Sequence, residues 1–281
     1  NSRIVEGEKM SKRSKKNKAS IWKIILSVLT VALVAIGGYF VFNSFVTPKG
    51  TTNEPKVTQE TKKPVYTASA EEKEYLSNRF KGLTATNSET IAYVYAPGTQ
   101  LDEPVVQTKD NETYLNKTFE GEQVPYLGAV FMDADNKKDF SDHLTWLFGH
   151  ARGSKVGDHR MFNDVNYYSR QEYFNEHPYV VIETPERKYY YEVTGVKVVN
   201  EFTNLYQIPT TPEKKGEFIN LFKDGARNWL ENSKISGEDN MTVFCTCRID
   251  DVALRTLVLA RQVPDNELKE FLEKNKELLN S

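Results

Sequence analysis

The sequence predicts a mainly β domain with helical additions. Short β-branched and aromatic runs recur between turn residues from residue 91 onward, a spacing typical of a barrel or a sandwich. Hydrophobic residues make up 39% of the chain and aromatic residues 12%, enough for a packed core. One apolar segment near the N-terminus stands apart from this pattern and predicts a membrane anchor.

The expected elements follow from local periodicity. A Ser-x-x-Glu start and good helix formers predict a helix over residues 68–81. Near-helical spacing of Phe and Leu predicts an inserted amphipathic helix over 214–232, and a similar pattern predicts a C-terminal helix over 265–279. Strands are predicted at 91–95, 104–107, 128–132, 143–148, 179–183, 189–193, 196–199, 241–247 and 254–263.

The N-terminal part divides by composition. Residues 1–20 hold a basic run and are expected to form a cytoplasmic tail, because positive charge favours the cytoplasmic side. The apolar residues 21–46 are long enough to span a bilayer, since about 20 residues suffice. A cleaved signal peptide is the alternative, but bulky residues end this segment. Residues 47–66 form a Thr-, Lys- and Pro-rich spacer, and 67–281 the folded extracytoplasmic domain.

Charge and cysteine content exclude some classes. The net charge is only −2 and no basic excess marks a nucleic-acid binder. The two cysteines, Cys245 and Cys247, are one residue apart and cannot be a disulfide framework. A zinc site on this pair is an alternative, but it requires two further ligands. We therefore expect no metal and no cofactor.

The last two predicted strands place a cysteine beside an arginine. If they form an antiparallel hairpin, Cys247 ends one strand and Arg255 begins its neighbour within side-chain reach. A fixed guanidinium stabilises a thiolate and can also stabilise charge on an attacked carbonyl. On this spacing alone, a structural cysteine and a surface arginine remain the alternative.

A histidine follows another predicted strand. Residues 144–148 have the pattern of a buried strand, and Gly149 and His150 stand where it ends. A histidine in this place can transfer protons, whereas His143, His159 and His177 lack it. A structural role for His150 is the alternative.

Several stretches in the right order resemble the class B sortases, over about residues 72–263. The similar stretches are residues 91–99 with 104–107, 114–119 with 128–133, Phe148-Gly149-His150, Cys245-Thr246-Cys247, and Arg255 eight positions after Cys247. The resemblance implies an eight-stranded sortase-type β-barrel, with N-terminal helices and an inserted helix before the strand that carries the nucleophile.

The resemblance also implies a membrane-anchored cysteine transpeptidase. Cys247 is then the nucleophile that attacks the Thr carbonyl of a C-terminal sorting signal and forms a thioester. His150 protonates the departing amine, and Arg255 holds the carbonyl region. The expected partners are surface proteins or pilins that carry a sorting signal, with an acceptor amine from a cell-wall precursor or a pilin lysine.

Two positions depart from the family pattern. Cys245 adds a second thiol two residues before the nucleophile, and Phe148 stands where tyrosine is common. These departures concern substrate subtype more than reaction class. A membrane-anchored surface domain that binds without catalysis is the alternative function, since an anchored β-rich domain fits it equally well.

Overall fold

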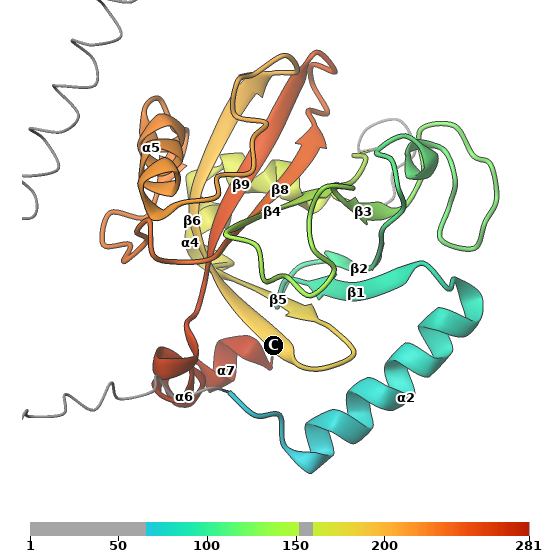
Figure 1. Cartoon of the computed structure of the whole chain (residues 1–281). Coiled ribbons are helices and arrows are strands. Elements are labelled where there is room, and N and C mark those ends of the chain that lie inside the picture. The colour runs from blue at the N-terminus through green and yellow to red at the C-terminus, as the bar shows by residue number, and fades with distance from the viewer. Residues whose placement is uncertain (1–65, 152–159, 281) are drawn as a thin grey trace, which may run out of the picture. The chain divides into compact units, whose positions relative to one another are not determined.

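A computed structural model describes residues 66–151 and 160–280 of the chain. Its strands close into a barrel in the order β5-β1-β2-β3-β4-β8-β9-β6, because β6 also pairs with β5 (Figure 1). The expected eight-stranded barrel with helical additions is confirmed. The strands are β1 (Thr90–Tyr95), β2 (Asp102–Val106), β3 (Val130–Met132), β4 (Leu144–Phe148), β5 (Tyr179–Glu183), β6 (Lys188–Asn200), β7 (Asn228–Trp229), β8 (Met241–Cys247) and β9 (Leu254–Gln262). The short β7 pairs only with β6, outside the closed ring.

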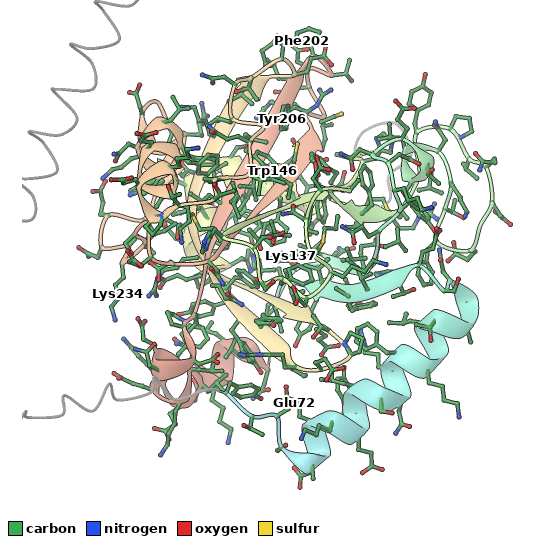
Figure 2. All side chains as sticks on the ribbon, in the orientation of Figure 1. Glu72, Lys137, Trp146, Phe202, Tyr206 and Lys234 are labelled. Atoms are coloured by element: carbon green, nitrogen blue, oxygen red, sulfur yellow. The ribbon has the colours of Figure 1, made fainter. Side chains whose placement is uncertain are left out.

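Helices lie outside the barrel (Figure 1). Ser69 caps α2 by accepting a hydrogen bond from the backbone N–H of Glu72, as the Ser-x-x-Glu pattern predicts. Glu72 in turn accepts the backbone N–H of Lys188 at 2.9 Å, which fastens α2 to the start of β6 (Figure 2). The helices are α2 (Ala70–Thr86), α4 (Gln171–Glu176), α5 (Pro212–Lys223), α6 (Asp265–Lys274) and α7 (Lys276–Leu279), with 3-10 turns at η1 (Thr113–Leu115) and η2 (Asp164–Ser169).

Two details of the sequence prediction were wrong. The inserted helix ends at Lys223 rather than at residue 232, because Gly225 takes a left-handed φ of 69° and terminates it. The predicted strands 189–193 and 196–199 form one strand, β6, with an irregularity between Val193 and Gly195 in its pairing with β9. A side chain at Gly195 would collide with the Trp229 ring.

Two clusters of buried apolar residues stabilise the barrel. One fills its interior and includes Phe162, Phe244 and Val258. The other lies between the outer face of the sheet and α5, where Phe218 and Phe222 cover alternate residues of β8. Side chains on a strand alternate between faces, so Phe244 points inward while Val243 and Cys245 point outward.

The predicted anchor, residues 21–46, lies outside the described residues, as do the basic tail and nearly all of the spacer. Within the described ranges, no helix is both long enough and apolar enough to cross a membrane.

Candidate active site

The nucleophile candidate lies at the end of β8. Cys247 continues the outward row of Val243 and Cys245, but it is only half-buried because it lies beyond the apolar cluster under α5. Its backbone carbonyl accepts a hydrogen bond from Asn166 Nδ2 at 2.9 Å. Asn166 Oδ1 in turn accepts the hydroxyl hydrogen of Thr256 on β9 at 3.0 Å. These bonds fix the end of the strand from the barrel side.

Arg255 lies directly opposite Cys247 on the neighbouring strand β9. The backbone N–H of Arg248 donates to the carbonyl of Leu254 at 3.0 Å, which makes Cys247 and Arg255 a non-hydrogen-bonded pair. Side chains of such pairs approach each other most closely, with Cβ atoms typically about 4.5–5.5 Å apart. The predicted hairpin, with Cys247 opposite Arg255, is thus present in the strand register.

His150 reaches the same place from the other side of β8. Strands β4 and β8 are parallel, with Phe148 opposite Cys245, and the Gly149 N–H donates to the Cys245 carbonyl at 3.2 Å. Continued by two residues, this register brings His150 level with Cys247. The strand order β4-β8-β9 therefore puts Cys247 in the middle, with His150 on one side and Arg255 on the other.

The histidine side chain is oriented by the β2–β3 segment. His150 Nε2 lies 2.8 Å from the carbonyl oxygen of Leu115, and because a carbonyl can only accept, Nε2 carries the hydrogen. In the neutral ring, Nδ1 then holds the lone pair. Gly149 is required beside it, since a Cβ there would lie 2.9 Å from the Phe162 ring.

These groups line one cleft, which has a volume of about 340 Å³. We call it the site cleft, and its lining is largely apolar. The lining residues are Asn111, Leu115, Phe131, Phe148, Gly149, His150, Tyr206, Cys245, Thr246, Cys247 and Arg255. All three predicted site residues are among them, and an apolar cleft with few polar groups is the usual form of a small-ligand site.

The second thiol differs from the first in burial. Cys245 is only 4% exposed, and burial raises the pKa of its thiol to about 12. Its sulfur lies 3.5 Å from the Tyr206 hydroxyl. A buried thiol stays protonated and unreactive at neutral pH. This supports Cys247 rather than Cys245 as the reactive cysteine.

Two aromatic residues of the cleft lining, Phe148 and Tyr206, pack against the buried Trp146. Trp146 stacks on Phe148 with ring centroids 6.0 Å apart and contacts the Tyr206 ring at 5.2 Å. Its indole N–H donates to the Gln207 carbonyl at 2.9 Å, which fixes the segment between β6 and α5. Figure 2 labels Trp146, Tyr206 and the 87% exposed Phe202 of that segment.

Sequence reasoning missed Asn166, Leu115 and Tyr206. Asn166 is 81 positions from Cys247, and the Leu115 carbonyl is 35 positions from His150. No local pattern marks either residue, because each contributes through a contact that only the folded chain creates.

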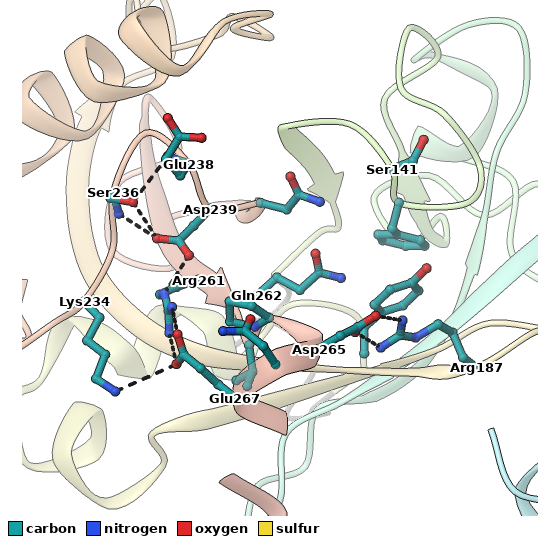
Figure 3. Close-up of a pocket in the computed structure, with 16 residues that line it drawn as sticks. Ser141, Arg187, Lys234, Ser236, Glu238, Asp239, Arg261, Gln262, Asp265 and Glu267 are labelled. Atoms are coloured by element: carbon teal, nitrogen blue, oxygen red, sulfur yellow. Dashed lines mark hydrogen bonds and ion pairs between the residues drawn. The ribbon is translucent and has the colours of Figure 1, made fainter. Parts of the chain in front are cut away.

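A second cleft, of about 680 Å³, opens where β9 ends and α6 begins (Figure 3). Its charged groups pair with one another. Arg261 contacts Asp239 at 3.1 Å and Glu267 at 2.8 Å, and Arg187 contacts Asp265 at 2.8 Å. These ion pairs connect β9, β6 and α6, so this cleft is best explained as part of the structure. Within the described residues, no group of three or more His, Cys, Asp or Glu side chains is placed to hold a metal ion.

A closed barrel with cysteine, histidine and arginine on adjacent strand ends defines a sortase-type protein, and the comparisons agree. No family model matches the chain. It is 25% identical to sortase B of Staphylococcus aureus over 84% of this chain and 95% of that protein. It is 26% identical to sortase B of Listeria monocytogenes over 60% of this chain and 67% of that protein.

Solved structures give the same result. The S. aureus sortase B–substrate complex aligns with a TM-score of 0.60 at 24% identity, over 67% of this chain and 86% of that chain. A class B sortase of Streptococcus pyogenes involved in pilus biogenesis aligns with a TM-score of 0.58 at 27% identity, over 66% of this chain and 98% of that chain. These similarities support a class B sortase, and with it a sortase transpeptidase.

Proposed function

We propose that the chain cleaves a C-terminal sorting signal after Thr and transfers the substrate to an amine, with Cys247, His150 and Arg255 as its catalytic residues. One observation carries the proposal. Three side chains from adjacent strands, each suited to one part of acyl transfer, line the same apolar cleft. The alternative of a non-catalytic binding domain does not account for this combination.

In the first half of the reaction, the Cys247 sulfur attacks the Thr carbonyl carbon and forms a thioester as the peptide C–N bond breaks. The departing amine takes a proton from the imidazolium form of His150, whose Nε2–H remains bonded to the Leu115 carbonyl. Arg255 donates hydrogen bonds to the carbonyl oxygen while it carries negative charge. The apolar side chains of Phe148 and Tyr206 in the cleft lining limit water, which would otherwise hydrolyse the thioester.

In the second half, an amine attacks the thioester carbonyl and gives a proton to His150, and the C–S bond breaks to release the Cys247 thiolate. The amine belongs to a cell-wall precursor peptide or to a pilin lysine. The pilus role of the similar S. pyogenes protein makes the pilin lysine a serious candidate. We further propose that residues 21–46 anchor the enzyme in the cell membrane as a single span, with the N-terminus cytoplasmic and residues 67–281 outside.

The test is capture of the thioester. A protein that starts near Val65 is mixed with candidate sorting-signal peptides, and intact mass spectrometry detects an adduct that hydroxylamine removes. We expect the adduct on the wild-type protein and not on Cys247→Ala. Adding a triglycine or a lysine-containing pilin peptide identifies the acceptor from the mass of the product. A wild-type protein that forms no adduct with any sorting-signal peptide, yet binds them, would support the binding-domain alternative.

A further inference from the structure

Next to Arg255, on the far side of β9, lies one more charged side chain, Glu201. On its far side β9 pairs with β6, where Val199 is opposite Arg255. Glu201 follows two positions later, and its backbone N–H donates to the Ala253 carbonyl at 3.1 Å, which extends the pairing beyond the strand. Glu201 Oε2 lies 2.8 Å from Arg255 Nη2. A carboxylate thus stands next to the guanidinium, on the side away from Cys247.

The hydrogen bonds of Arg255 explain what this carboxylate does. A guanidinium has five N–H groups. Nη1 donates to the carbonyls of Val252 at 2.7 Å and Leu254 at 3.1 Å, and Nη2 donates to Glu201. The other two N–H groups have no protein partner among the described residues. Val252 lies in the loop between β8 and β9, and Leu254 begins β9, so Glu201 is the contact that ties the guanidinium to a different segment, the one that follows β6.

We propose that Glu201 is a positioning residue that holds Arg255 in the orientation needed at the substrate carbonyl. This rests on the proposed role of Arg255. Fixing a long arginine side chain costs conformational entropy. The hydrogen bond to Glu201 fixes Arg255 before the substrate binds, so this cost does not add to the barrier of the reaction. The carboxylate therefore does two things: it accepts a hydrogen bond from Arg255, and it brings a negative charge next to the guanidinium.

The two effects can be separated by substitution. Glu201→Ala removes both the anchor and the charge, whereas Glu201→Gln keeps a hydrogen-bond acceptor and removes only the charge. Asp250→Ala is the matched control, since Asp250 is an exposed carboxylate of the neighbouring loop that pairs with Arg248 instead.

The experiment measures the rate of thioester formation and the turnover of a sorting-signal peptide, in wild-type and Arg255→Ala backgrounds. For Glu201→Ala we expect kcat to fall about 10-fold with KM changed less than about 2-fold. In the Arg255→Ala background the same change has no further effect, because Glu201 acts only through Arg255. Glu201→Gln and Asp250→Ala stay within about 3-fold of wild type.

Wild-type kcat in Glu201→Ala, or an equal loss in both backgrounds, overturns the proposal. Failure of the proposed function gives a different result, since wild-type protein then forms no thioester or Arg255→Ala keeps full activity.

Discussion

Replacement of Arg255 by lysine keeps a positive charge in the site cleft but changes its geometry. The guanidinium makes three hydrogen bonds at 2.7–3.1 Å, and its other two N–H groups have no partner in the part of the chain that the structure describes. A lysine ammonium has three N–H groups on a single atom. If they satisfy the carbonyls of Val252 and Leu254 and the Glu201 carboxylate, none is left for the reacting carbonyl.

The expected size of the effect follows from this count. Loss of one hydrogen bond to a developing oxyanion costs about 2.7–4 kcal/mol, or roughly 10²–10³ in kcat. Stability changes little, because Arg255 lies at the cleft surface and exposed ion pairs contribute about 0–1 kcal/mol. Arg255→Lys should therefore fold normally and lose at least about 100-fold in turnover.

The assay compares kcat and KM for the peptide that labels Cys247, with thermal unfolding as the control for folding. Arg255→Ala shows the loss when no cation is present, and a similar loss in both variants means that hydrogen-bond geometry matters more than charge. Turnover of Arg255→Lys within about 3-fold of wild type would refute the assignment of Arg255 to the oxyanion side.

Three further predictions concern other parts of the site. Cys245→Ala should keep much of the wild-type turnover, because the native Cys245 thiol is buried, has a pKa raised to about 12 and serves to pack the core. Loss of the thioester adduct in this variant would contradict that role. Burial raises the pKa of Glu103 from 4.5 to about 7. As pH rises between these values, the carboxyl loses its proton in the unfolded chain before it does so in the folded protein. The free energy of unfolding therefore falls over this range, by at most about 3 kcal/mol. Glu103→Gln should flatten this dependence in urea unfolding at pH 5 and pH 8, and an unchanged slope would exclude Glu103 as its source. Gly149→Ala should lower kcat by 10-fold or more, because the new Cβ would lie 2.9 Å from the Phe162 ring and the resulting shift would displace His150. A normal kcat would show that the Phe162 ring can move without displacing the histidine.

Local sequence was enough to define many elements. The pattern of residues 241–247 predicted β8 with its observed bounds, since alternating outward and inward residues cover two different apolar clusters. The hairpin of β8 and β9 could also be inferred, because its two strands are joined by a short loop. The nearness of Cys247 and Arg255 thus follows from a contact that is local in sequence.

The rest of the site depends on contacts between distant segments. His150 lies beside Cys247 only because β4 pairs in parallel with β8, almost a hundred residues away, and the residues alone did not specify that pairing. Only the family resemblance indicates that His150 acts together with Cys247. Glu201 comes from β6 through the second edge of β9, and no motif in the sequence marks it.

The sequence by itself therefore determined the strands, the reactive residue types and the hairpin that joins two of them, because hydrophobic periodicity and turn residues act over a few positions. Only the tertiary structure decided which strand ends meet and what orients each candidate catalytic side chain. The physical reason is that closure of the barrel sets these contacts, and closure depends on the packing of the whole core rather than on any one segment.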